Sequence, residues 1–272
     1  MNLLSASKRV ISHIIVQLPY RAQRLLYSIL YLNLYEGQLS GGERWVGKTW
    51  GELMDIGEYT HVMRAYRYYW IAPTLKGKSV LDLGCGSGYG SYYLSHFADS
   101  VVGVDRSTEM IEWARHHFKR PNLKFRVGNA LRIPFSHNSF DVVVCVELIE
   151  HLPPRDQETL LKQIASVGKE KLYMTTPNGD PLCFRMIERK LAGCPEMTEF
   201  HELEYCPREF QTLLKKYFSH CTFFGQRLKN VETFRDWIRA KKHVLTLNDF
   251  EMTQRNLRTC SNIAVVCVLG DN

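Results

Sequence analysis

The chain has 272 residues, of which 45% are hydrophobic and 23% charged, and this composition excludes disordered and collagen-like proteins. Its length suits one large domain, or one domain with appendages. The formal net charge of +7 is uneven, because residues 1–50 contain six basic and two acidic side chains and residues 227–258 contain eight and four. Two basic stretches beside a nearly neutral core favour an anionic partner such as a membrane surface, although solvated faces would give the same pattern.

The first predicted unit is a helical extension, residues 1–55. Its segment 21–35 is rich in Leu, Ile and Tyr and begins with Arg21 and Arg24. Such a segment either lies in a membrane interface as an amphipathic helix, which would make the protein peripheral to a membrane, or packs on the domain as a lid. No window reaches the ~18 apolar residues of a membrane-spanning helix, and no signal peptide is evident.

Residues 56–272 are predicted to form one α/β domain. From residue 79 onward, short apolar runs alternate with helical patterns, which predicts a doubly wound, seven-stranded Rossmann-like sheet with helices on both faces. We expect it to be mostly parallel, with an antiparallel last strand and a capping insertion at residues 228–260. The predicted strands are residues 79–83, 101–104, 123–127, 140–145, 171–175, 221–224 and 262–269.

A glycine-rich turn joins the first predicted strand to the helix that follows it. Gly84, Gly86 and Gly88 alternate there, and glycine lets the main chain approach a ligand closely. The dinucleotide fingerprint G-x-G-x-x-G fails because its third glycine position is occupied by Tyr89. The alternating spacing, with Asp82 two residues earlier, favours a cofactor that carries an amino-acid tail, whose ammonium group donates to the carboxylate.

Further candidate cofactor contacts follow the next strands. Asp105 ends the second strand, where an acid can accept hydrogen bonds from both ribose hydroxyls; the alternative role, capping the next helix, suits Ser107 better. Asn129 follows the third strand and can bond an adenine edge. The remaining predicted cofactor contacts are Cys85, Arg106, Ala130 and Val146.

These landmarks, in this order, carry a family resemblance. Residues 79–177 resemble the class I methyltransferases of the group that includes the ubiquinone-biosynthesis O-methyltransferases, and the fuller pattern over residues 59–228 is similar to methyltransferases of bacterial surface-glycan biosynthesis. The resemblance implies S-adenosylmethionine as the cofactor and leaves the acceptor open. This chain has Asn129 where the family usually has an acidic residue.

The predicted catalytic residue is His151, which follows the fourth strand. An oxygen acceptor must lose a proton, and histidine titrates near neutral pH; a structural role in the loop is the alternative. Glu147, Glu150 and His151 also match an E-x-x-E-H pattern at which, by the resemblance, a divalent metal can bind. We do not predict a metal site here, and a divalent metal held by these three residues is kept as the alternative to a base that acts without a metal. The pair His201-Glu202 is a second candidate for the base.

The aromatic helix before the first strand has two open interpretations. It either covers the cofactor and stacks on the acceptor or simply packs on the sheet, and its Arg67 is a candidate for the cofactor carboxylate. The aromatic residues are Tyr59, Tyr66, Tyr68, Tyr69 and Trp70.

The predicted function is methyl transfer to a small-molecule or glycan acceptor, at an oxygen. Nucleic-acid methylation is less favoured, because amino-methylating enzymes of that kind usually carry a Pro-Pro-aromatic motif after the fourth strand. A non-catalytic cofactor-binding module is a further alternative. Eight scattered cysteines without a Cys-x-x-Cys pair predict free thiols and a cytoplasmic location.

Overall fold

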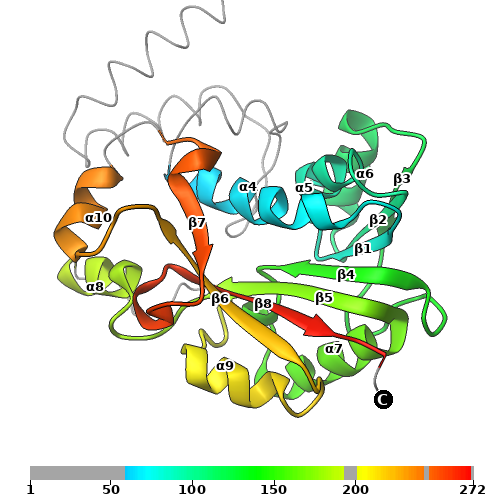
Figure 1. The fold of residues 1–272 in the computed structure, drawn as a ribbon. Helices are drawn as coiled ribbons and strands as arrows, with labels where there is room; N and C mark the ends of the chain where they lie inside the picture. The colour runs from blue at the N-terminus through cyan, green and yellow to red at the C-terminus, as the bar shows by residue number, and fades with distance from the viewer. Residues whose placement is uncertain (1–58, 193–200, 242–244, 271–272) are drawn as a thin grey trace, which may run out of the picture.

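The fold is seen in a computed structural model, which describes residues 59–192, 201–241 and 245–270 (Figure 1). The predicted extension, residues 1–55, lies outside the described residues, as does the segment proposed to contact a membrane. Among the described helices, none is both long and apolar enough to cross a membrane.

One sheet of eight strands organises the described residues, in the order β3-β2-β1-β4-β5-β8-β6-β7. Strands β1 to β5 pair in parallel, and β8 runs antiparallel to both of its neighbours, β5 and β6. The predicted doubly wound sheet with an antiparallel last strand is therefore confirmed. The strands are Ser79–Leu83 (β1), Ser100–Asp105 (β2), Leu123–Val127 (β3), Phe140–Val146 (β4), Gly168–Pro177 (β5), Cys221–Leu228 (β6), Phe250–Thr253 (β7) and Asn262–Val268 (β8).

The predicted number of strands, seven, is wrong by one. The additional strand is β7, which lies inside the predicted insertion and pairs antiparallel with β6. It is only four residues long, with one fully buried side chain, so its own sequence carries no clear alternation. Pairing with the exposed edge of β6, rather than local pattern, makes this segment a strand.

Helices cover both faces of the sheet (Figure 1). Helices α4, α5 and α6 pack on one face through a core that includes Ile71, Leu94 and Ile111. Helices α7 and α9 pack on the other through Leu160 and Phe210. The helices are Tyr59–Ile71 (α4), Tyr89–Leu94 (α5), Thr108–His117 (α6), Pro154–Val167 (α7), Phe184–Leu191 (α8), Pro207–Leu214 (α9) and Phe234–Ala240 (α10).

The insertion packs against α4 rather than standing apart. A separate apolar cluster joins Met63 and Tyr66 of α4 to Trp237 and Phe250 of the insertion. Behind it, the buried side chain of Gln226 accepts a hydrogen bond from Arg67 and donates one to the main chain of Met63. The aromatic helix is thus at least partly a packed helix, since Tyr66 and Tyr68 are buried.

Two of the cysteines are paired, so the expectation of free thiols is wrong for them. Cys221 and Cys267 form a disulfide between β6 and β8, where they are direct partners across the antiparallel ladder. The 46 residues between them hide this juxtaposition in the sequence. Five other cysteines of the described residues are free, and all of these except Cys206 are buried.

Candidate functional site

A cavity of about 820 Å³ opens at the carboxyl ends of β1, β2 and β4, where ligands bind in doubly wound sheets. It brings together most of the residues predicted from the sequence. Asp82 and Gly88 are not among its lining residues, and no described residue of the insertion 228–260 lines it. The predicted residues that line it are Gly84, Cys85, Gly86, Asp105, Arg106, Asn129, Ala130, Val146 and His151.

The glycine turn has three left-handed residues, of which Gly86 and Gly88 are needed for different reasons. Gly84, Gly86 and Gly88 have φ angles of 78°, 54° and 83°, which side chains disfavour. A Cβ atom on Gly86 would meet nothing within 4 Å, whereas one on Gly88 would lie 2.7 Å from Phe125. Gly86 therefore keeps the floor of the cavity open to a ligand, while Gly88 allows the turn to pack against the core.

Asp105 holds the same turn from the second strand. Its Oδ2 accepts a hydrogen bond from the Gly86 amide at 2.9 Å, and its Oδ1 accepts one from the Ser107 amide at 2.8 Å. The Ser107 hydroxyl, not Asp105, caps α6 by accepting from the amide of Met110. A carboxylate has about four acceptor positions, so Asp105 retains capacity for the ribose hydroxyls proposed from the sequence.

Asp82 lies behind the turn and is completely buried. Its Oδ2 accepts a hydrogen bond from the Ser91 hydroxyl at 2.6 Å, while its Oδ1 has no hydrogen-bond partner among the described residues. Burial raises the pKa of Asp82 to about 7, although the bond from Ser91 opposes that rise. A buried carboxylate oxygen without a partner is costly, and an ammonium group brought into the cavity, directly or through water, would remove that cost.

This raised pKa predicts a pH-dependent stability of the unliganded protein. From the usual value of 3.8 to about 7, folded Asp82 keeps a proton that the unfolded chain has lost, so the free energy of unfolding falls as pH rises through this window. The contribution is roughly 4 kcal/mol at most. In urea unfolding at pH 5 and pH 8, Asp82→Asn should show a smaller decrease in stability than the wild type. The exposed Asp99→Asn is the matched control, and an unchanged decrease in Asp82→Asn would contradict the assignment.

The side-chain oxygen of Asn129 forms a hydrogen bond within its own loop. Its Oδ1 accepts a hydrogen bond from the amide of Leu131 at 2.9 Å, and the residue forms an isolated bridge with Arg132. The side-chain oxygen therefore shapes the loop along the cavity, and the neighbouring amides and the Asn129 NH₂ group are left to face an adenine edge.

Arg67 is a larger part of the site than its sequence context indicated. It is fully buried, lines the cavity, and forms an ion pair with Glu147 at 3.2 Å. Its Nη2 atom has no hydrogen-bond partner among the described residues. Glu147 also accepts from Thr175 and Asn262 and has a left-handed φ of 54°. These contacts hold a guanidinium at the cavity wall, where it can bind a carboxylate.

A second group of titratable side chains gathers at the short 3₁₀ helix Ile149–His151. Ligand atoms of Glu150, His151 and His201 lie within 4.8 Å of one another, and the rings of the two histidines are 4.9 Å apart. The main chain joins the two segments, because the Glu202 amide donates to the Glu150 carbonyl at 2.7 Å. The second candidate base, His201, therefore lies beside the first.

Glu204, which was not among the residues predicted from the sequence, orients His201. His201 Nδ1 lies 2.6 Å from Glu204 Oε1, and Arg185 donates to both oxygens of the same carboxylate. Burial alone would raise the pKa of Glu204, but the bonds from His201 and Arg185 outweigh it and lower that pKa. The ionised carboxylate fixes the ring so that Nε2 is the nitrogen remaining for other contacts. The sequence feature that could have indicated this contact is the position of Glu204, three residues after His201.

The group of Glu150, His151 and His201 could also hold a divalent cation. This set differs from the E-x-x-E-H set of the sequence, because His201 takes the place of Glu147. Glu147 is engaged by Arg67, whereas Glu150 and His151 meet His201. The Glu150 carboxylate is buried, Oε2 accepts from Thr176, and Oε1 has no hydrogen-bond partner among the described residues. Burial and the nearby Glu147 raise the pKa of Glu150. One carboxylate and two imidazoles, one of them oriented by a carboxylate, are a suitable donor set for a transition metal or zinc.

Comparison with known proteins supports the family resemblance that the sequence motifs indicate. A methyltransferase domain model matches residues 80–171. The chain is 36% identical over 109 residues to a ubiquinone biosynthesis O-methyltransferase of Coxiella burnetii (strain Dugway 5J108-111), covering 39% of this chain and 46% of that protein. It is 32% identical over 127 residues to a protein of Mycobacterium tuberculosis (strain ATCC 25618 / H37Rv) named a probable S-adenosylmethionine-dependent methyltransferase, covering 46% and 45%.

A solved structure extends the likeness in fold beyond this segment. A SAM-dependent methyltransferase from Archaeoglobus fulgidus aligns with a TM-score of 0.54 and 16% identity, covering 89% of this chain and 99% of that one. The matches in sequence, by contrast, span about half the length of the curated relatives. Residues 80–171 therefore match a methyltransferase domain, and the comparisons support the resemblance of the chain to class I, S-adenosylmethionine-dependent methyltransferases.

Proposed function

We propose that the protein transfers the methyl group of S-adenosylmethionine to a hydroxyl group of a small-molecule or glycan acceptor. The observation that carries this proposal is the position of His151, which lines the same cavity as the glycine turn and Asp105. A base beside the cofactor site is useful for an oxygen acceptor, which must lose a proton. The name of the Coxiella burnetii relative, an O-methyltransferase, supports the same chemistry.

In the proposed cofactor site each part of the cofactor meets a different group. Asp105 accepts from the ribose hydroxyls, and the loop of Gly128, Asn129 and Ala130 faces the adenine, with Arg106 and Val146 on the adjoining walls. The amino-acid tail lies over the glycine turn, where Asp82 receives the ammonium and Arg67 the carboxylate. Opposite charges at the two ends of the tail orient the sulfonium methyl.

Methyl transfer then needs alignment and one proton acceptor. The acceptor oxygen attacks the methyl carbon in line with the breaking carbon–sulfur bond, a carbon–oxygen bond forms, and S-adenosylhomocysteine leaves. His151 takes the hydroxyl proton. His201, held by Glu204, packs edge-on against the His151 ring at an interplanar angle of 79° and keeps it in position.

A divalent cation is an alternative at the same group, favoured by the unpartnered oxygen of Glu150. Glu150, His151 and His201 would hold it, and a bound cation would lower the pKa of the acceptor hydroxyl. The residues around it would still exclude water and orient the acceptor. A chelator would then abolish activity. If His151 acts as the base without a metal, the activity should persist in the presence of a chelator.

Incubation with methyl-labelled S-adenosylmethionine tests the proposal. The acceptor panel contains hydroxylated aromatic compounds, oligosaccharides and oligonucleotides, with and without a chelator. We expect label in an ether of a hydroxylated compound and an equal amount of S-adenosylhomocysteine. Label on an oligonucleotide base would favour the nucleic-acid alternative instead. Intact cofactor that stays bound in the presence of every acceptor would indicate a binding module and overturn the proposal.

A further inference from the structure

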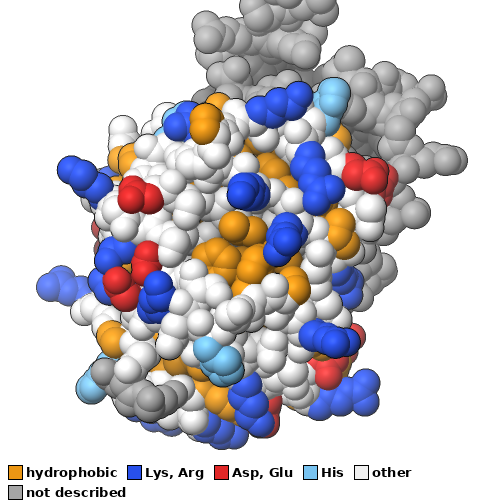
Figure 2. Space-filling model, turned by 90° about the vertical axis from the view of Figure 1, so that its right-hand side faces the viewer, with side chains coloured by type: hydrophobic (Ala, Val, Ile, Leu, Met, Phe, Trp, Pro, Cys, Tyr) orange, Lys and Arg blue, Asp and Glu red, His pale blue; other side chains and the backbone are white. Residues whose placement is uncertain are grey.

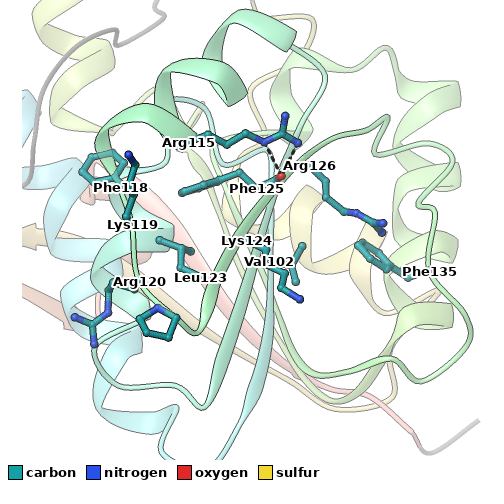
Figure 3. Close-up of a pocket in the computed structure, with 11 residues that line it drawn as sticks. Val102, Arg115, Phe118, Lys119, Arg120, Leu123, Lys124, Phe125, Arg126 and Phe135 are labelled. Atoms are coloured by element: carbon teal, nitrogen blue, oxygen red, sulfur yellow. Dashed lines mark hydrogen bonds between the residues drawn. The ribbon is translucent and has the colours of Figure 1, made fainter.

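A second hollow, of about 890 Å³, lies along the edge strand β3 and shares no lining residue with the cofactor cavity. We refer to it as the β3 groove. Figure 2 views the molecule from this side and shows hydrophobic side chains in a hollow with Lys and Arg around it, and Figure 3 shows the lining residues. They are Val102, Arg115, Phe118, Lys119, Arg120, Pro121, Leu123, Lys124, Phe125, Arg126 and Phe135.

The groove exists because one crossover of the sheet has no helix. Residues 128–139, which connect β3 to β4, contain none, whereas α7 and α9 cover the same face further along the sheet. Over β2 and β3, the part of the described chain that meets this face is the connecting loop, including the half-buried Phe135. Val102 of β2 is consequently only half-buried.

The outer edge of β3 offers main-chain hydrogen-bonding groups. The Asn122 carbonyl accepts from β2 and the Gly128 amide donates to β2, so the alternation of a strand turns the main chain of Phe125 and Val127 outward. The Arg115 guanidinium confirms this direction, since it donates to the Phe125 carbonyl at 2.8 and 3.1 Å (Figure 3). The Leu123 amide is bonded to the Arg120 carbonyl and the Phe125 carbonyl to Arg115. Another extended chain could therefore pair with the remaining groups of this edge, which are the Leu123 carbonyl, the Phe125 amide and the main chain of Val127.

The charges of the groove all have one sign. Five of its eleven lining residues are basic and none is acidic. No ion pair joins these five to a carboxylate of the described residues. Arg126 instead lies 5.3 Å above the Phe135 ring. Like charges would oppose pairing with a second copy of this edge and favour a partner that carries negative charge.

We propose that the β3 groove binds an acidic, extended polypeptide segment of a partner protein as an added strand. Main-chain bonds to the outer edge of β3 would give register, and the Lys and Arg residues would receive acidic side chains. Base stacking is disfavoured because Phe118 and Phe125 are only 5% and 6% exposed and the half-buried Phe135 ring lies under Arg126, which leaves little ring surface for a nucleic-acid base. A bilayer is disfavoured because the apolar floor is recessed below the basic rim.

Fluorescence anisotropy with a labelled octapeptide of alternating glutamate and valine tests the proposal on the full chain. Binding should weaken at least about tenfold in the double variant Lys124→Glu, Arg126→Glu, whose residues lie outside the cofactor cavity. The double variant Lys215→Glu, Lys216→Glu, exposed after α9, is the matched control and should bind as the wild type does. Lys119→Glu provides an independent variant, and thermal unfolding with S-adenosylmethionine binding checks that each variant folds.

Two further measurements separate strand addition from simple charge attraction. A peptide with proline in place of every valine keeps its charge but cannot donate from those positions, and it should bind at least about tenfold more weakly. Hydrogen exchange should slow at the amides of Phe125 and Val127 when the original peptide binds. Equal binding of both peptides, or absence of binding, overturns the proposal. It also fails if an oligonucleotide or phosphatidylserine vesicles bind in the peptide's place and lose affinity in the Lys124→Glu, Arg126→Glu variant.

Discussion

Replacing His151 by alanine is expected to slow methyl transfer by roughly 10²–10⁴-fold while leaving the affinity for S-adenosylmethionine nearly unchanged. The imidazole lines the cavity beyond the glycine turn, so its removal takes away the proton acceptor without touching the ribose or tail contacts. Single-turnover kinetics with labelled cofactor, together with calorimetry, would separate these two effects. His137→Ala is the matched control, since His137 is exposed and contacts Ser166, away from this cavity.

His201→Ala distinguishes the base from the metal alternative. If His151 acts as the base, loss of His201 removes only the ring that positions it, and the rate should fall less than in His151→Ala. If a cation is held by Glu150, His151 and His201, both variants should be equally slow and a chelator should inactivate the wild type. Full activity of His151→Ala would exclude it from both roles.

The part of the cavity around the glycine turn could be predicted because it is local in the chain. Gly84, Gly86 and Gly88 lie within one turn, and the φ angles they need are reserved for glycine in any fold. Asp105 follows from knowing where the second strand ends, and its distance to Gly86 then follows from parallel pairing of β1 and β2. Short-range pattern and the strand order were therefore sufficient for the turn and its carboxylate.

The contacts that hold His151 and Arg67 at the cavity could not be predicted in the same way, because they join segments that are far apart in the sequence. His201 is brought beside His151 by the main-chain bonds of Glu202 and Leu203 to the Glu150 carbonyl, and Arg67 reaches Gln226 across 159 residues. No hydrophobic periodicity or short motif in the sequence indicates either contact. The same reason explains the missed disulfide and the missed strand β7, both of which depend on the register of β6 with its neighbours.

Asp105→Ala is expected to lower the affinity for S-adenosylmethionine by roughly two to four orders of magnitude, because hydrogen bonds to a charged group are each worth about 1.5–3 kcal/mol. Calorimetry on the purified protein measures this directly. Asp99→Ala is the matched control: Asp99 is exposed and does not line the cavity, so this variant should keep the wild-type affinity. Wild-type affinity in Asp105→Ala would contradict the pocket assignment.

Asp105 has two roles that this variant alone cannot separate, since its carboxylate also fixes the amides of Gly86 and Ser107. A cofactor analogue that lacks one ribose hydroxyl separates them through a double cycle. If Asp105 binds the ribose, the analogue should bind the wild type more weakly than the natural cofactor does, and Asp105→Ala should bind both equally. If Asp105 only holds the turn, the loss of the hydroxyl should cost the same in both proteins, and the ribose contact would have to come from another residue of the cavity.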